Sequence, residues 1–321
     1  MLMVILNFIL LFVGFLPLIF GSNLLVDGSS SLAKKLKVPV LVIGMTVVAF
    51  GTSMPEMVVN IFAAIQGSSD IVIGNVIGSN LFNIMVVLGA TALFMAIPVK
   101  RSTITVEFPL AILAVVLVLL LGNDRFVESR AFSEVSRGDG VILLLFFCLF
   151  LLYNYFLYKK GVSAEHIEIK EHKIIVSVIM IVLGSILLIA GGRMIVITGV
   201  FVARHIGISE RIIGLTIISI GTSLPELTTS IVAAIKKNHD IAMGNIIGSN
   251  IFNIFFVLGL SSIISPVTIG NEANIDIILN AAVTMLILLF IFTNKQRAVK
   301  LWHALTLLAG YTGYILYLII K

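Results

Sequence analysis

Two glutamates lie deep inside long apolar segments of this chain, where an ionisable side chain is costly to place. Glu56 ends the segment GTSMPE (51–56), and Glu226 ends the matching segment GTSLPE (221–226). A charged group at the centre of a hydrocarbon layer costs about 2.5–3.5 kcal/mol on insertion scales, so its presence indicates a functional site. Each preceding proline lacks an N–H and clashes with the carbonyl four residues earlier, so the helix must kink or open there. Freed main-chain carbonyls would then lie beside two hydroxyls and a carboxylate. A purely structural role is the alternative, but Arg193 is the one cation within these segments and cannot serve both carboxylates well.

A second motif supplies amides and hydroxyls. The segment GNVIGSNLFN (74–83) is matched by GNIIGSNIFN (244–253). Residues four apart share one face of a helix, so Asn75, Ser79 and Asn83 lie on the same face. A packing face of small residues would explain the glycines and serines, but it explains the six asparagines poorly, because an amide is costly in lipid. We therefore expect ion ligands on this face, foremost Asn83, Asn253, Ser79 and Ser249.

The donor atoms of both motifs are all oxygens. Oxygen ligands suit calcium, sodium or magnesium and argue against zinc or copper. The five histidines lie in loops or at helix ends, and the single cysteine, Cys148, lies in a hydrophobic run. Calcium takes about 6–8 oxygens with flexible geometry, and two glutamates would balance its charge. Once calcium leaves, sodium ions or protons must neutralise the carboxylates, which is the physical basis for coupled exchange at one site.

The elements that must position these motifs are long and apolar. Of the 321 residues, 59% are apolar and 12% are charged, and the mean hydropathy is +1.17. Soluble domains average about 45–50% apolar and about 25% charged residues, so the composition indicates an integral membrane protein. Lipid offers the backbone no hydrogen-bond partners, so spans of this length should be helices. We predict an all-α polytopic protein with ten transmembrane helices, of which helices 2, 3, 7 and 8 are broken or kinked around a midplane ion site. The predicted spans are 3–26, 38–65, 71–97, 104–121, 140–158, 174–200, 212–235, 241–265, 277–293 and 301–320.

The chain repeats one unit twice. Residues 44–89 and 214–259 align without a gap at an offset of 170, with 25 identities in 46 positions. We predict a first five-helix repeat at 1–158, a cytoplasmic linker at 159–173 and a second repeat at 174–321. Because five is an odd number of spans, the two repeats must enter the membrane from opposite sides. Inverted repeats place matching segments face to face near the bilayer midplane, where transporters hold their substrates.

Lysine and arginine are distributed unevenly between the predicted loops. If the N-terminus faces outside, fourteen of the 21 fall on the cytoplasmic side, six fall outside and Arg193 lies within a span. Cytoplasmic loops carry an excess of these residues, so we predict a multi-pass protein of the cytoplasmic membrane with both termini extracellular. The net charge of +5 is not gathered into one basic patch, which argues against nucleic acid, and no obligate protein partner is evident.

GTSMPE and GTSLPE, each followed by GNxxGSNxFNI, resemble the two alpha repeats of the sodium/calcium exchanger branch of the cation/calcium antiporter superfamily, in its prokaryotic form. The resemblance covers essentially the whole chain. It implies a secondary active antiporter, not an enzyme and without a cofactor, that exchanges Ca²⁺ for Na⁺ by alternating access. It further implies that Glu56 and Glu226 bind Ca²⁺ and also serve Na⁺, while helices 1 and 6 slide as gates. The other ligands that it implies are the carbonyls of Thr52, Thr222, Ala49 and Ser219 and the side chains of Ser53, Ser223, Ser79 and Ser249.

One position departs from the family pattern. Relatives often carry an aspartate in one repeat where this chain has Asn83 and Asn253. The site then holds two carboxylates rather than three, which leaves potassium co-transport and the ion stoichiometry open. The linker of about fifteen residues, 159–173, has no room for a calcium-sensing regulatory domain.

Three other functional classes are alternatives to sodium/calcium exchange. A Ca²⁺/H⁺ antiporter stays open because glutamates also bind protons, although the Ser-x-Pro-Glu sequence at each kink favours sodium. An intramembrane serine hydrolase would need a His or Lys base at membrane depth, and none is present. A passive channel would show flux that does not saturate and needs no counter-ion.

Overall fold

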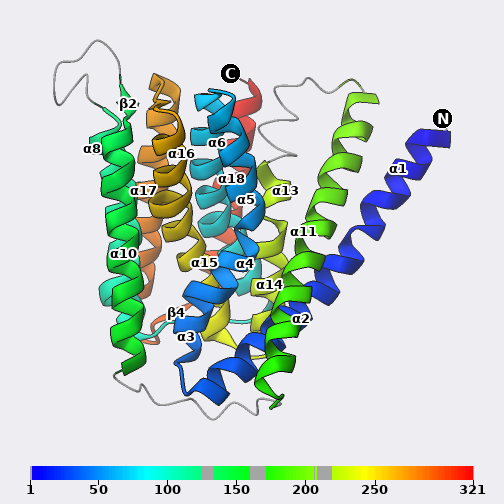
Figure 1. The fold of residues 1–321 in the computed structure, drawn as a ribbon, viewed down its shortest axis with the longest axis vertical. Helices are drawn as coiled ribbons and strands as arrows, with labels where there is room; N and C mark the ends of the chain where they lie inside the picture. Colours follow the sequence, from blue (N-terminus) through cyan, green and yellow to red (C-terminus); the bar gives the residue numbers. More distant parts are fainter. Residues whose placement is uncertain (1, 124–132, 160–170, 206, 208–218, 321) are drawn as a thin grey trace.

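Helices form nearly all of the fold (Figure 1). The structure is a computed structural model that describes residues 2–123, 133–159, 171–205, 207 and 219–320. Residues 160–170 of the predicted linker and 212–218 of the seventh predicted span lie outside the described residues. The elements of the first half, with η for a π-helical segment, are α1 (Leu2–Val13), α2 (Phe15–Leu36), α3 (Val40–Ile43), η1 (Gly44–Val48), α4 (Ala49–Thr52), α5 (Met54–Ile65), α6 (Ser69–Phe82), η2 (Asn83–Val87), α7 (Leu88–Phe94), β1 (Ile97–Pro98), η3 (Thr103–Glu107), α8 (Phe108–Leu121), β2 (Glu134–Val135) and α10 (Arg137–Lys159). Those of the second half are α11 (Ile174–His205), α13 (Ser219–Thr222), α14 (Leu224–Ile235), α15 (His239–Phe252), η5 (Asn253–Leu258), α16 (Gly259–Ile264), β3 (Val267–Thr268), α17 (Asn271–Thr293), β4 (Ala298–Val299) and α18 (Leu301–Ile320).

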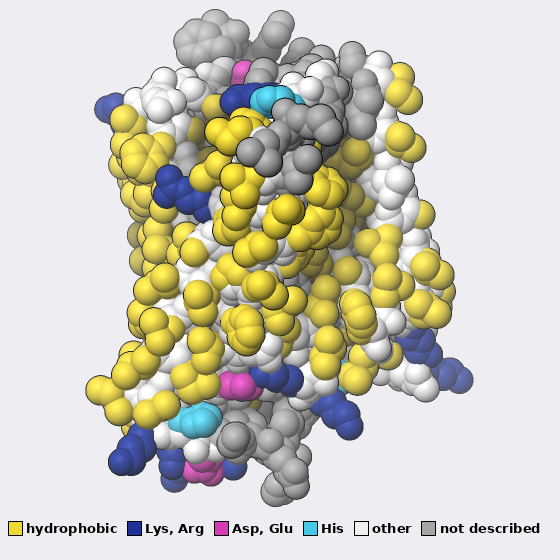
Figure 2. Space-filling view, turned by 90° about the vertical axis from the view of Figure 1, so that its right-hand side faces the viewer, with side chains coloured by type: hydrophobic (Ala, Val, Ile, Leu, Met, Phe, Trp, Pro, Cys, Tyr) yellow, Lys and Arg dark blue, Asp and Glu magenta, His cyan; other side chains and the backbone are white. Residues whose placement is uncertain are grey.

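The protein is a multi-pass membrane protein. Within the described residues, seven helices are long and apolar enough to cross a membrane, or eight if the bent pair Val40–Thr52 and Met54–Ile65 is one span. The ten predicted spans include two further helices: α18, of 20 residues, and the shorter apolar Leu224–Ile235. Hydrophobic side chains cover the middle of the face in Figure 2, while most charged side chains gather toward its two ends.

Matching elements recur in the two halves at the sequence offset of 170. The bounds of α5 and α6 map in this way onto those of α14 and α15. In Figure 1 the chain rises from α3 through α4 to α5, whereas it descends from α13 to α14. Two short antiparallel pairings tie the halves together, with Ile97 of β1 opposite Val299 of β4 and Val135 of β2 opposite Val267 of β3. Each half therefore completes a small sheet of the other.

Four irregular places in the helices coincide with the two motifs. The chain bends by 51° between α4 and α5, where Ser53 has φ −84° and ψ 7°. Ser223, between α13 and α14, has nearly the same conformation, with φ −92° and ψ 6°. In the spans of α6 and α15 the irregularity is not a break but a π-helical segment, which begins at Asn83 in one and at Asn253 in the other. Such segments frequently mark functional sites, because the wider turn re-aims the side chains that it carries.

The long helices α2 and α11 pack against each other with backbones in close contact. A Cβ atom on Gly21 would lie 2.7 Å from the carbonyl oxygen of Gly184, and one on Gly184 would lie 2.8 Å from that of Gly21. Small residues at such crossings let transmembrane helices approach closely, where van der Waals packing holds them together. The pair stands beside the remaining helices in Figure 1.

Candidate ion-binding site

Glu56 and Glu226 each lie just after a kink, inside the bundle. They occupy the first turns of α5 and α14, directly behind a proline, and both side chains are fully buried. Proline is favoured in a first turn because the N–H that it lacks would have no helical partner there. The start of a helix also stabilises negative charge through its unpaired N–H groups. The local sequence thus sets a carboxylate at each kink.

Serines of the opposite half hold these carboxylates. Ser223 Oγ donates a hydrogen bond of 2.9 Å to Glu56 Oε1, and Ser53 Oγ donates one of 2.9 Å to Glu226 Oε1. All four side chains are fully buried. Hydrogen bonds to an ionised acceptor are roughly twice as strong as neutral ones. The two kinks, 170 residues apart in the chain, therefore meet at one place.

Ser79 and Ser249 extend the network from α6 and α15. The hydroxyl oxygens of Ser79 and Ser223 lie 3.0 Å apart. Ser223 has a single hydroxyl proton, which it donates to Glu56, so Ser79 must be the donor to Ser223. Ser249 Oγ lies 3.5 Å from the Glu226 oxygen that Ser53 also contacts. Each carboxylate therefore lies against two serines, Ser223 and Ser79 at Glu56, and Ser53 and Ser249 at Glu226.

Asn75 and Asn245 fasten each kink to the neighbouring span. Thr52 Oγ1 donates to Asn245 Oδ1 at 2.9 Å, and Thr222 Oγ1 donates to Asn75 Oδ1 at 3.4 Å. The amide nitrogens of the same asparagines reach the main-chain oxygens of the two glutamates, at 3.5 Å in the first half and 3.3 Å in the second. Each asparagine thereby joins a kink of its own half to the kink of the other. The spacing of Asn75, Ser79 and Asn83 predicted a shared helix face, but it could not identify the hydrogen-bond partners of the asparagines.

Asn80 and Asn250 join the two halves to each other. Asn80 Nδ2 donates to the Asn250 main-chain oxygen at 3.1 Å, and Asn250 Nδ2 donates to that of Asn80 at 3.4 Å. Asn80 Oδ1 also accepts a hydrogen bond of 3.2 Å from Asn253 Nδ2. Asn80 and Asn250 were not among the foremost expected ligands. Their contacts indicate a structural role, which is to join the two halves.

Several buried polar atoms at this place have no hydrogen-bond partner. They are Glu56 Oε2, Glu226 Oε2, Asn253 Oδ1 and both amide atoms of Asn83. Buried polar groups are otherwise almost always paired, and an unpaired one costs about 1–3 kcal/mol, or more when charged. None of the ion pairs found among the described residues involves either glutamate. Four of the five atoms are oxygens, the donor type that a hard cation accepts.

The carbonyls expected as ligands belong to the short helices that precede the kinks. These helices are α4 (Ala49–Thr52) and α13 (Ser219–Thr222). The Ala49 carbonyl accepts a hydrogen bond of 3.0 Å from the Ser53 N–H. Thr52 Oγ1 lies 3.3 Å from the same carbonyl, but its one proton is donated to Asn245 at 2.9 Å, so a lone pair of the Ala49 carbonyl stays available.

A third buried carboxylate, Glu107, lies outside this network. It lies near the start of a span, at the end of η3, and its side chain is fully buried. The Tyr153 hydroxyl on α10 donates to Glu107 Oε1, while Oε2 has no partner. Among the described acidic residues, full burial is therefore not confined to Glu56 and Glu226. The tyrosine that covers Glu107 comes from another span, which local hydropathy does not reveal.

Comparison with known proteins identifies the class of this chain. The sequence profile of the sodium/calcium exchanger protein family matches residues 6–156 and 176–320, once in each half. The chain belongs to this family, as its two motifs predicted. It is therefore a membrane transporter of the cation/calcium exchanger class and not an enzyme.

Individual relatives cover nearly its whole length. CaxA of Alkalimonas amylolytica is 38% identical over 316 residues, which are 95% of this chain and 96% of that protein. The sodium/calcium exchanger MaX1 of Methanosarcina acetivorans is 30% identical over 348 residues, covering 98% and 99%. The inner membrane protein YrbG of Escherichia coli is 36% identical over 269 residues, covering 80% and 79%. A solved structure of the sodium-calcium exchanger NCX_Mj, soaked with 10 mM Na⁺ and zero Ca²⁺, matches with a TM-score of 0.81 at 31% identity, covering 97% of this chain and 98% of that one.

Proposed function

We propose that this protein is a secondary active antiporter that exchanges Ca²⁺ for Na⁺ by alternating access. One observation carries the proposal. Two fully buried carboxylates, Glu56 and Glu226, are linked through serines of the opposite half, and each keeps one oxygen without a partner. The names of two relatives point the same way, since MaX1 and NCX_Mj are both called sodium/calcium exchangers.

Ca²⁺ would bind between Glu56 and Glu226. Calcium accepts about 6–8 oxygen ligands at about 2.3–2.6 Å, and two carboxylates balance its charge. The carbonyls of Thr52 and Thr222, at the ends of α4 and α13, would supply further ligands. No three His, Cys, Asp or Glu side chains gather into a cluster in the part of the chain that the structure describes. The neutral ligands would therefore be hydroxyl, amide and carbonyl oxygens, which a hard cation accepts.

Na⁺ would use the neutral oxygens around each carboxylate. A serine hydroxyl that donates its proton to a glutamate keeps lone pairs for a cation. The proposed Na⁺ ligands are the side chains of Ser53, Ser223, Ser79, Ser249, Asn83 and Asn253 and the carbonyls of Ala49 and Ser219. The Ala49 carbonyl accepts one N–H, from Ser53, and keeps a second lone pair that Na⁺ could use.

The electrostatics of the site favour exchange over leak. An uncompensated buried charge costs several kcal/mol. If Ca²⁺ left and nothing replaced it, two such charges would remain, since no ion pair among the described residues reaches Glu56 or Glu226. The site would therefore release Ca²⁺ readily only when another cation takes its place, which in this proposal is Na⁺.

We also propose ten transmembrane helices in two inverted five-helix repeats, 1–158 and 174–321, joined by a cytoplasmic linker at 159–173. The offset of 170 and the opposite directions of α3–α5 and α13–α14 support this arrangement, and both chain ends lie at the same end of the molecule in Figure 1. The charge distribution favours the cytoplasmic membrane with both termini outside. The closely packed α2 and α11 would slide together as the gate.

Calcium uptake into proteoliposomes tests the proposal. Vesicles loaded with Na⁺ are compared with vesicles loaded with K⁺ or choline at matched pH on both sides. Uptake that requires internal Na⁺ and is lost in Glu56→Gln would support exchange through this site. Uptake that ignores Na⁺ and follows an imposed pH gradient would make the protein a Ca²⁺/H⁺ antiporter instead. Flux that needs no counter-ion would make it a channel.

A further inference from the structure

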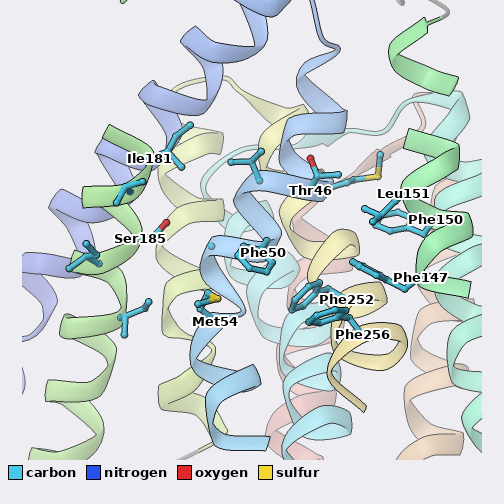
Figure 3. A pocket seen from close by; sticks show the side chains of 16 residues that line it. Thr46, Phe50, Met54, Phe147, Phe150, Leu151, Ile181, Ser185, Phe252 and Phe256 are labelled. Carbon is cyan, nitrogen blue, oxygen red and sulfur yellow. The ribbon is translucent and has the colours of Figure 1, made fainter. Parts of the chain in front are cut away.

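A cavity of about 610 Å³ opens on the side of the bundle, between the kinked span of α3–α5 and the helices α10, α11 and α15. Its walls are almost entirely apolar. Figure 3 shows aromatic rings from three helices around it, among them Phe50 of α4, Phe147 of α10 and Phe252 of α15. It is separate from the ion site, whose charged and amide side chains do not line it.

The cavity extends from the surface that faces lipid into the core. At its mouth, Val182 and Ile186 of α11 are 51% and 54% exposed, whereas Phe252 in its wall is 3% exposed. Both mouth residues lie well inside the 29-residue apolar span Ile174–Val202. A residue in the middle of such a span lies at the depth of the hydrocarbon chains. The mouth therefore opens to acyl chains and not to water.

The polar atoms of the lining give water little to bind. Thr46 and Ser185 are the two hydroxyl residues of the lining, and Thr46 Oγ1 already donates to the Val42 carbonyl at 2.6 Å. A buried water needs about 2–4 polar partners, and apolar cavities stay dry or take up apolar ligands. An acyl chain would instead gain dispersion contacts with the aromatic walls. We propose that this cavity binds one acyl chain of a bilayer lipid.

The bound chain would lie beside the helix that leads into the ion site. Gly51, which lines the cavity, directly precedes Thr52. A Cβ atom on Gly51 would lie 2.7 Å from Ser185 Oγ, so α4 and α11 are in close contact at this point. The acyl chain would fill the space next to that contact. It would thus form part of the wall between the kinked span and α11.

Fluorescence quenching by brominated lipid tests the proposal without any transport assay. The chain has one tryptophan, Trp302, which is 54% exposed. In a Trp302→Phe background, Phe252→Trp places a reporter in the cavity wall, and Phe255→Trp places one in the fully buried core three residues further on. Should the second variant fail to fold, Phe108→Trp supplies another fully buried position. The proteins are reconstituted in dioleoyl phosphatidylcholine with and without bromine at the double bonds.

We expect the Phe252→Trp reporter to lose a fraction of its fluorescence close to that lost by native Trp302, while the core reporter keeps nearly all of its own. A second pair of variants separates a chain inside the cavity from lipid at its rim. Val182→Phe narrows the mouth and should reduce quenching of the Phe252→Trp reporter. Leu183→Phe, on the same helix and 49% exposed but outside the lining, should leave it unchanged. Equal quenching of the cavity and core reporters, or equal effects of the two α11 variants, would overturn the proposal.

Discussion

Replacing Glu56 by glutamine removes one of the two charges that we propose balance Ca²⁺. Glutamine keeps the size of the side chain, and its Oε1 can still accept the hydrogen bond from Ser223. The fold should therefore survive, since the loss is confined to one negative charge and one unpartnered oxygen, Oε2. Glu226→Gln removes the matching charge in the other half.

The size of the effect follows from the burial of the site. Removing one member of a buried charge pair costs about 3–5 kcal/mol, and about 1.4 kcal/mol corresponds to a factor of ten. We count bound Ca²⁺ as the partner, because Glu56 is fully buried and makes no ion pair among the described residues. Calcium affinity should then fall roughly 150- to 5,000-fold. Sodium affinity should fall less, because the remaining carboxylate still balances one Na⁺.

Calcium uptake into Na⁺-loaded proteoliposomes measures the effect, with Ca²⁺ varied over four decades. Glu107→Gln is the matched control, since Glu107 is also fully buried with one unpartnered oxygen but lies outside the network of the kinks. Glu107→Gln should change the Ca²⁺ dependence of uptake little. The reasoning is refuted if Glu56→Gln exchanges Ca²⁺ with near-normal affinity, or if Glu107→Gln weakens it as much.

Three further predictions concern the Na⁺ affinity, the contacts between the two halves and the membrane topology. Ser223→Ala should raise the half-saturating Na⁺ concentration roughly 10- to 100-fold, since a hydrogen bond to a charged group contributes about 1.5–3 kcal/mol. Ser53→Ala should raise it to a similar degree, because each glutamate has a second serine nearby, Ser79 at Glu56 and Ser249 at Glu226. Asn80→Ala should lower the free energy of unfolding by about 1–3 kcal/mol, seen as a lower melting temperature in detergent, because two cross-half hydrogen bonds of its side chain are lost. In a Cys148→Ser background, Lys35→Cys should react with an impermeant thiol reagent only from the cytoplasmic side.

Each of these predictions has a clear contrary result. A Na⁺ dependence that stays unchanged in both serine variants would show that the hydroxyls do not bind Na⁺ directly. Asn7→Ala is the control, because the Asn7 amide donates to Met3 of its own helix α1. An unchanged melting temperature in Asn80→Ala would show that the cross-half bonds contribute little. Labelling of Lys35→Cys from outside, with Arg137→Cys labelled only from inside, would reverse the proposed topology.

Much of the fold followed from hydropathy and the internal repeat. Continuous apolar runs predict helices because lipid cannot pair the backbone, and the structure is helical throughout apart from four two-residue strands among the described residues. The kinks at Ser53 and Ser223 followed from the prolines. The family followed from the two motifs, and the family profile confirmed it.

The sequence could not predict contacts that depend on how the halves dock. Each half-motif contains a serine and a glutamate three residues apart, which suggests a local contact, yet each serine binds the glutamate of the other half. The π-helical segments at Asn83 and Asn253 were also missed, because their sequences carry no Pro or Gly break at that point. Nor could the sequence show that Glu107 is covered, since its covering residue, Tyr153, belongs to a different span.

The reciprocal contacts between the kinks have the form of an isologous interface, in which residue i of one copy binds residue j of the other and the reverse. With the offset of 170 removed, the serine at 53 binds the glutamate at 56 of the opposite unit, and each unit does the same. A single ancestral repeat, inserted in both orientations, would have built the whole site as an antiparallel homodimer. Every substitution in that ancestor would have changed both half-sites at once. In a single chain the two half-sites can differ, as they do at the buried Asn60, which corresponds to Ser230.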